Sequence, residues 1–436
     1  MATRQIDSRC GPLLVHEGNG LIHGRGIVYA TADRFAAPTQ LAEHADVVDA
    51  TTRGPACPQL PSRLEFVTGP VTNALAISEH CQVLSVTAPT DADRLPVMVW
   101  FHGGAYITGS GEAVKYDADS LTTEGDVVVV NVSYRLGVFG YLNLHDRDTE
   151  NLGLRDQICA LRWVQDNIAA FGGDPARVTV FGQSAGGDSV VALLLCPEAT
   201  GLFTRAILQS TPLSLRDGRS AMTDAMREAA AAALSGTSPT EASVRQLLDA
   251  QVAALRAAQR FGLLGGLAFA PIAGCAPLPP SDEMQSLIAD AASRVEILAG
   301  YTRDDARPFV VMSPRGRRLR RLGPAGNAIT VASGRATTQR VFGRPTIELV
   351  KAWTAAGGHG ATYRVNWSPQ GAPLGACHCI ELPLLFGTPD SWSDAPMLGP
   401  EPRCVDTELA QRVRAQWSAF AHDGTAALDR ASLRIA

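Results

Sequence analysis

Ser184 is the residue of this sequence whose neighbours most clearly indicate chemistry. It lies in the stretch GQSAG (residues 182–186), which fits the pattern G-x-S-x-G, between the strand-like run 178–181 and the apolar segment 188–195. A serine on a sharp turn from a strand to a helix presents its hydroxyl, and glycines on either side let the backbone make that turn. The pattern predicts a nucleophile at Ser184, with an ordinary glycine-serine turn as the alternative.

Two adjacent glycines upstream of Ser184 are candidates for stabilising a negative charge. Gly103 and Gly104 follow the apolar run 97–102 directly. Acyl transfer to a serine places charge on the carbonyl oxygen of the substrate, which needs N–H donors that are already in position. A glycine pair can turn its amides toward that oxygen, and the residue after the nucleophile supplies a further amide. We therefore expect the amides of Gly103, Gly104 and Ala185 to form an oxyanion hole rather than a plain turn.

A serine hydroxyl also needs a base, and the sequence contains nine histidines. His378 is the best candidate because it follows the last predicted strand after a short loop, downstream of Ser184. The other histidines belong to the glycine loop, to the N-terminal part, to a predicted surface loop or to helices and their ends: His102, His16, His23, His44, His80, His145, His359 and His422.

The histidine in turn needs a carboxylate that orients its ring. In the chain order serine, acid, histidine, the acid follows a strand between residues 184 and 378. The run 295–302 ends just before Asp304 and Asp305, so either aspartate could serve. The alternative for each is a solvated turn carboxylate or a helix N-cap.

Short β-branched runs recur through the chain with helical patterns between them, which predicts the fold class. The runs are near-continuously apolar, as expected for strands that are covered on both faces; they are 97–102, 127–134, 178–182, 205–210, 295–302 and 361–367. Their alternation with helices predicts an α/β protein with a doubly wound, mostly parallel sheet.

The segment 154–171 is the clearest helix of the sequence. Leu154, Ile158, Leu161, Val164 and Ile168 recur on one stripe of it. We expect the helix to stop at Gly172-Gly173, and Asp174-Pro175 to open a loop into the next strand.

Two insertions interrupt the alternation of strands and helices. We expect them to belong to a single domain that spans residues 1–436. Residues 212–290 are helical and rich in alanine, and residues 306–357 combine proline, glycine and helical patterns. We expect both to form a cap over the carboxyl edge of the sheet. The basic run 314–323 in the second insertion is expected to be a solvated loop, with an anionic partner as the weaker alternative.

Composition excludes several classes of protein. The formal net charge of −5 gives no attraction to nucleic acid or to anionic membranes. No apolar stretch approaches the 18 residues or so that a membrane span requires, and no signal-like segment begins the sequence, so we expect a cytoplasmic protein. The nine cysteines lack metal-ligand spacing, including Cys377 and Cys379 beside His378, which favours reduced thiols and no metal or organic cofactor.

Several long motifs together resemble the type-B carboxylesterases, the cholinesterase-like branch of the α/β-hydrolases that includes para-nitrobenzyl esterases. They span nearly the whole chain: GRGIVYATADRF, WFHGGAYITGSG, VNVSYRLGVFGYL, FGGDPARVTVFGQSAGG, GYTRDDA and GACHCIELPLLFG. The resemblance implies an α/β-hydrolase fold with Ser184 as nucleophile, His378 as base and Gly103, Gly104 and Ala185 as the oxyanion hole.

The resemblance also bears on the acid and on two cysteines. The acid position of the family usually holds glutamate and corresponds here to Asp305, whose side chain is shorter. Cys57 and Cys81 match a pair that is often joined by a disulfide in secreted members, and we expect them to be reduced but close together in space.

The sequence thus predicts a serine carboxylesterase that acts on a small-molecule ester through an acyl-enzyme, as a monomer or a homodimer. Two alternatives are left open. The same triad could act on amide, lactone or thioester bonds, since selectivity lies in pocket residues. A binding protein on the same fold is the other, because fold alone does not determine function.

Overall fold

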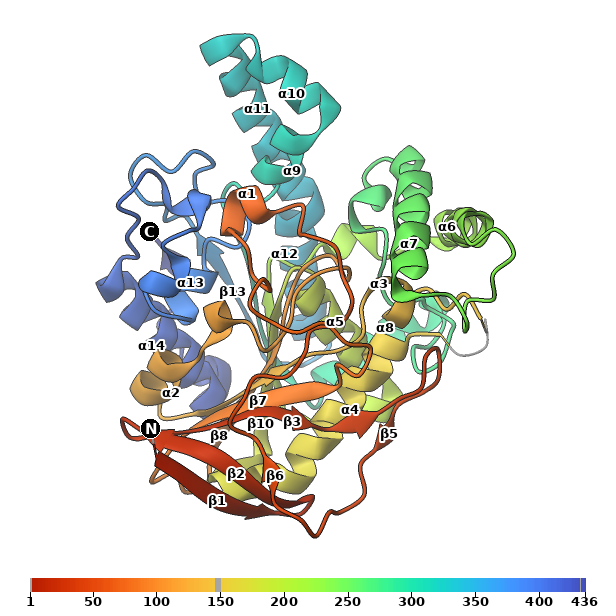
Figure 1. Cartoon of the computed structure of the whole chain (residues 1–436). Coiled ribbons are helices and arrows are strands. Elements are labelled where there is room, and N and C mark those ends of the chain that lie inside the picture. The colour runs from red at the N-terminus through yellow and green to blue at the C-terminus, as the bar shows by residue number, and fades with distance from the viewer. Residues whose placement is uncertain (1, 146–149, 432) are drawn as a thin grey trace.

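The computed structural model describes residues 2–145, 150–431 and 433–436. Within these residues, twelve strands form one sheet through the middle of the molecule (Figure 1). In spatial order they are β1 (Ala2–Ser8), β2 (Gly11–Gly18), β3 (Leu21–Val28), β7 (Val83–Pro89), β9 (Val128–Val132), β8 (Leu95–Phe101), β10 (Gly173–Gln183), β11 (Arg205–Gln209), β12 (Glu296–Thr302), β13 (Gly360–Val365) and β14 (Arg434–Ile435), with β6 (Val48–Asp49) beside β2; β4 (Ala30–Thr31) and β5 (Thr39–Gln40) pair separately.

The sheet is mostly parallel, as predicted. From β9 to β14 every neighbouring pair is parallel, and all the strands expected from the sequence lie in this part. The neighbours from β1 to β9 are antiparallel. The carboxyl ends of the parallel strands meet at one edge, which is where ligands bind in open α/β sheets.

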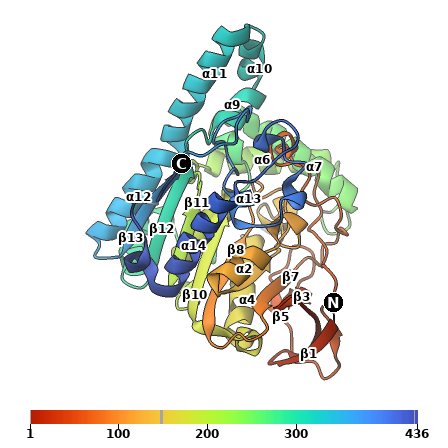
Figure 2. The ribbon, with the colours of Figure 1, turned by 90° about the vertical axis from the view of Figure 1, so that its left-hand side faces the viewer.

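Helices cover both faces of the sheet, as Figure 2 shows in the view turned by 90°. They are α1 (Glu65–Thr68), α2 (Asp119–Gly125), α3 (Gly137–Gly140), α4 (Leu152–Asn167), α5 (Ala185–Leu194), α6 (Ser220–Ala233), α7 (Val244–Ala258), α8 (Met284–Ala292), α9 (Arg307–Met312), α10 (Pro314–Arg320), α11 (Gly323–Thr338), α12 (Arg344–Ala355), α13 (Leu382–Leu385) and α14 (Thr407–Asp423).

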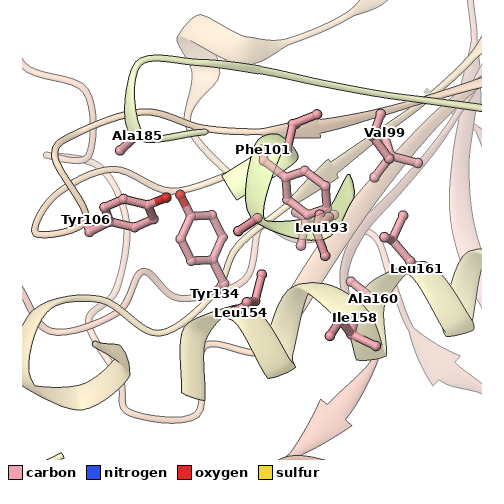
Figure 3. Close-up of a cluster of buried hydrophobic side chains, with 14 of the residues drawn as sticks. Val99, Phe101, Tyr106, Tyr134, Leu154, Ile158, Ala160, Leu161, Ala185 and Leu193 are labelled. Atoms are coloured by element: carbon pink, nitrogen blue, oxygen red, sulfur yellow. The ribbon is translucent and has the colours of Figure 1, made fainter. Parts of the chain in front are cut away.

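Alternate side chains of β8 enter two different hydrophobic cores. Val99 and Phe101 pack in the core that contains α4 and α5, part of which Figure 3 shows. Trp100 points to the opposite face, where its ring centroid lies 4.9 Å from that of Phe181 and 4.8 Å from that of Phe386. Because both faces are buried, the strand reads as a continuous apolar run rather than an alternating one. The doubly wound arrangement is confirmed.

The helix predicted at 154–171 forms with small differences. Its apolar stripe is buried, and α4 continues as a 3-10 turn over Ile168–Phe171 that ends at Gly172. The expected loop at Asp174-Pro175 is wrong, because β10 already begins at Gly173. Its pairing with β8 shifts register between Gly173 and Val178, so the proline lies at an irregularity of the ladder.

Helices also occupy the two predicted insertions. α6, α7 and most of α8 lie in residues 212–290, and α9 to α12 lie in residues 306–357, with α10 and α11 projecting away from the sheet in both views (Figures 1 and 2). The solvated loop expected at 314–323 is wrong in part: its arginines are exposed, but residues 314–320 form α10. Ser313 caps this helix by accepting a hydrogen bond from the amide of Gly316, and arginine is a good helix former.

The predicted proximity of Cys57 and Cys81 is confirmed. Both are buried and free, and their side chains are in hydrogen-bond contact, which together with burial raises the pKa of the Cys81 thiol well above its usual value. Among the residues that the structure describes, no helix is both long and apolar enough to cross a membrane.

A buried ion pair ties the loop after β9 to α4. Asp156 accepts hydrogen bonds from the backbone amide, Nε and Nη2 of Arg135 at 3.0, 2.8 and 2.7 Å. The other guanidinium nitrogen donates to the carbonyl of Ala36, and the two side chains are 4% and 0% exposed. Every strong donor therefore has a partner, which a buried pair requires.

We predict that Asp156→Ala lowers the free energy of unfolding by about 3–5 kcal/mol, because it leaves a buried guanidinium without its counter-charge. The control is Asp249→Ala, which breaks the exposed pair of Arg245 and Asp249 on α7 and is expected to change stability by less than about 0.5 kcal/mol. Urea unfolding of both variants measures the difference, and equal losses would contradict the prediction.

Candidate active site

Ser184 occupies the turn between β10 and α5. It has φ 58° and ψ −118°, a conformation that is strained for a residue with a side chain. Its amide donates to the carbonyl of Gln209 on β11 at 2.8 Å, and its carbonyl accepts the amide of Asp188 in the first turn of α5. These two bonds hold the strained backbone at the carboxyl edge of the sheet.

The glycines around Ser184 and after β8 are required by close backbone contacts. A Cβ on Gly186 would lie 1.9 Å from the carbonyl oxygen of Phe101, at the end of β8. A Cβ on Gly103 would lie 2.7 Å from the carbonyl oxygen of Gln183 and 3.3 Å from Cβ of Ser184. The glycine loop after β8 therefore presses directly against the serine turn, and both positions exclude any side chain.

His102 supports this loop from behind. It is fully buried, its Nδ1 lies 2.8 Å from the carbonyl oxygen of Gly103, and its ring stacks on Tyr134 with centroids 4.5 Å apart. Burial lowers the pKa of His102 to about 4, so the ring is neutral at neutral pH. A neutral ring with Nδ1 protonated donates to the carbonyl of Gly103 and adds no positive charge to the site.

His378 lies in the loop after β13 and is fully buried. Its Nδ1 is 2.5 Å from Oδ1 of Asp305. The rings of Phe309 and Phe342, both from the insertion 306–357, flank it with centroids 5.1 and 5.6 Å away. A hydrogen bond from Nδ1 to a carboxylate leaves Nε2 unprotonated and able to accept a proton, which is the form a general base needs.

The two neighbouring aspartates after β12 face different partners. Asp305 is fully buried, and its second oxygen accepts the amide of Thr302 at 3.0 Å. Asp304 pairs with the backbone of Ala376, and its carboxylate contacts Nε of Arg303 at 2.9 Å and Nε of Arg335 at 3.1 Å. Since Asp304 is held in a bridge to the strand-like segment before His378, its successor Asp305 is the one turned toward the imidazole.

Two further polar residues of the site had no place in the sequence prediction. Nε2 of His378 lies 3.1 Å from Nε2 of Gln183, so the amide of Gln183 rather than the hydroxyl of Ser184 is the described hydrogen-bond partner of this atom. Glu381 is fully buried, and burial together with the charge of Asp305 raises its pKa to about 8. An acidic residue within the apolar run 380–386 was the available signal for Glu381.

A mainly apolar pocket opens at Ser184 and His378. Gly104 lines it beside them, and so do residues of both predicted insertions, such as Leu215, Leu267, Phe309, Val341 and Phe342. The arrangement can hold a substrate with an apolar portion, present it to the serine, and keep the imidazole away from bulk water. No metal or organic group is needed for any of these steps.

Several known proteins are similar to this chain in sequence. The sequence model described as the Carboxylesterase family matches residues 17–321. A protein of Rhodococcus erythropolis named "probable N-octanoylanthranilate hydrolase" is 43% identical over 404 residues, which is 92% of this chain and 88% of that protein. The para-nitrobenzyl esterase of Bacillus subtilis is 35% identical over 444 residues, 93% of this chain and 87% of the relative.

Solved structures agree with these matches. A thermophilic PNB esterase superposes with a TM-score of 0.79 at 31% identity, covering 97% of this chain and 92% of that one. A carboxylesterase of Geobacillus stearothermophilus superposes with a TM-score of 0.74 at 30% identity, covering 96% and 91%. The fold is that of the α/β-hydrolases. The chain belongs to the carboxylesterase family and is a carboxylic ester hydrolase of its type-B branch.

Proposed function

We propose that Ser184, His378 and Asp305 are the catalytic triad of this esterase and that the amides of Gly103, Gly104 and Ala185 form its oxyanion hole. The observation that carries the proposal is the buried contact of 2.5 Å between His378 and Asp305, in the pocket that Ser184 also lines. The close fit of the glycine loop against the serine turn supports the oxyanion hole. Asp304 has a structural role in the proposal, as the counter-charge of neighbouring arginines.

The proposed reaction has two halves. Nε2 of His378 takes the proton of Ser184 while Oγ attacks the ester carbon, and the three amides hold the resulting oxyanion. The imidazolium, oriented by Asp305, then protonates the leaving alcohol, and an acyl-enzyme remains. In the second half, water attacks the acyl-enzyme with the same assistance from His378, and the carboxylic acid and free Ser184 are released. For the first step, the hydroxyl of Ser184 has to replace the amide of Gln183 as the partner of Nε2.

We also propose that the insertions 212–290 and 306–357 act as the cap of a single domain and select the substrate. Support comes from the pocket, whose walls include residues of both. The apolar walls favour an ester with an extended hydrocarbon portion, since each buried methylene contributes about 0.8 kcal/mol. A location in the cytoplasm and a monomeric or homodimeric state stay predictions from the sequence.

The name of the Rhodococcus relative favours a second candidate function, the hydrolysis of an aryl amide. That relative is named for an N-octanoyl amide of an aromatic acid, and it aligns with 92% of this chain. The same triad can cleave an amide when the leaving nitrogen is protonated by the histidine.

Ser184→Ala is expected to lower kcat for p-nitrophenyl octanoate by about 10⁴-fold or more, because the acyl-enzyme cannot form. The wild type is expected to release p-nitrophenol with each acylation and to be labelled by an organophosphate at Ser184, which mass spectrometry of the peptide detects. Undiminished hydrolysis in the variant, or a label on another residue, would exclude the proposed nucleophile.

Asp305→Asn is expected to lower kcat by about 10⁴-fold, because an amide favours the wrong tautomer of His378. The matched control is Asp304→Asn, which keeps the size of the side chain. It is expected to lower kcat by less than about tenfold, since the arginines that lose their partner, Arg303 and Arg335, are 32% and 56% exposed and can be solvated by water. Steady-state kinetics and circular dichroism of both variants provide the test. The reverse ranking would show that Asp304 is the acid.

Ester and amide activity are distinguished with two substrates that share the octanoyl group. We expect a higher kcat/KM for p-nitrophenyl octanoate than for N-octanoylanthranilate, because an amide has the poorer leaving group. Both activities should vanish in Ser184→Ala. If the amide is cleaved with the higher kcat/KM, the amide is the substrate to which the pocket is adapted.

A further inference from the structure

Arg63 stands out among the residues around the catalytic pocket. It lies in the loop before α1 and lines the pocket together with Ser184 and His378. Among the described residues of the pocket wall, it is the single arginine or lysine, and none is aspartate or glutamate. A permanent positive charge has thus been placed in a pocket whose other walls are mainly apolar.

The guanidinium of Arg63 is held in position by two contacts. Nη2 donates to the carbonyl of Gly266 in the 3-10 turn Leu264–Leu267, and Cζ lies 5.8 Å from the ring centroid of Phe309. Phe309 also lies beside the proposed base, since its ring centroid is 5.1 Å from that of His378. The guanidinium and the proposed base therefore both contact the ring of Phe309.

No carboxylate forms an ion pair with Arg63 in the part of the chain that the structure describes. Glu65, two residues along, lines a neighbouring hollow instead. The side chain is open to solvent, yet the protein around it desolvates the guanidinium and lowers its pKa. By contrast, Arg303 and Arg335 nearby share Asp304.

Such an arginine is suited to bind an anion. A guanidinium has five N–H donors in a planar fork that matches a carboxylate, and a single hydrogen bond to Gly266 leaves most of them available. A carboxylate that enters the pocket would supply a counter-charge and would be oriented by paired, charge-assisted hydrogen bonds from the guanidinium.

The position of Arg63 indicates which part of the substrate carries the anion. His378 has to reach the leaving alcohol in order to protonate it, so the alcohol portion lies on the side of the imidazole. Phe309 links that side to Arg63. We propose that Arg63 forms an anion subsite of the catalytic pocket and selects esters whose alcohol portion carries a carboxylate, with an apolar acyl group. This inference rests on the proposed triad and deepens it.

A purely structural role is the competing explanation, because the bond to Gly266 ties the loop before α1 to the first insertion. The two roles differ in what they change. A purely structural bond affects kcat/KM equally for every substrate, whereas a subsite changes the ratio of kcat/KM between a charged substrate and its neutral isostere.

The test compares 3-(octanoyloxy)benzoate with 3-(octanoyloxy)benzamide, and the corresponding 4-substituted pair, by chromatographic measurement of the released phenol. For at least one pair, the wild type should favour the benzoate by about tenfold or more in kcat/KM. Arg63→Met, which keeps an apolar stem, should bring that ratio to about 1, and Arg63→Lys should retain part of it. Arg260→Met, at an exposed arginine of the insertion 212–290 that is not part of the pocket wall, should keep the wild-type ratio.

Three results would overturn the subsite: equal kcat/KM for both members of each pair in the wild type, a preference for the benzamide, or an unchanged ratio in Arg63→Met. An equal loss of kcat/KM for both substrates in Arg63→Met would assign Arg63 the purely structural role instead. Failure of the triad proposal looks different. In that case Ser184→Ala keeps hydrolysing both members of a pair, whatever the ratio between them.

Discussion

The close contact between two backbone turns is the constraint on which this site depends. The turn at Ser184 and the glycine loop after β8 approach so closely that a methyl group on Gly186 or Gly103 would overlap a carbonyl oxygen. Parallel pairing of β8 with β10 brings the two turns to the same edge of the sheet. The strained backbone of Ser184 is then held by hydrogen bonds to β11 and α5.

The rest of the site follows from the same edge. β12 and β13 are the next parallel strands, and they carry Asp305 and His378 in the segments that follow them. The bridge between Asp304 and Cys377 joins these segments and sets which of two identical side chains turns inward. Asp305 and its neighbour thus differ in surroundings alone: one faces an imidazole, the other faces arginines.

The sequence predicted the parallel part of the sheet and the segments that carry the site, because buried strands leave continuous apolar runs and turns leave glycines. It missed the antiparallel strands β1, β2, β3 and β7, whose sequences mix polar with apolar residues and so lack a continuous apolar run. The residue pattern left both Asp304 and Asp305 open as the acid, and the resemblance to the carboxylesterases assigned Asp305. The bridge between Asp304 and Cys377, which are far apart in the chain, is the tertiary contact that the pattern could not reveal. Gln183, Glu381 and Arg63 were not singled out, because tertiary packing determines their partners: Gln183 contacts His378, Glu381 is buried near Asp305, and Arg63 lines the pocket.

The proposed site separates the residues assigned to reactivity from those assigned to selectivity. The residues proposed for bond cleavage are positioned by backbone contacts at the sheet edge, which tolerate little change. Much of the rest of the pocket wall comes from residues of the two predicted insertions and of the loop before α1. Substitutions there can alter the charge and size of the accepted substrate without moving the strands. Arg63, which has no counter-charge among the residues that the structure describes and shares the ring of Phe309 with the proposed base, is a feature by which a pocket wall can change substrate preference while the fold stays the same.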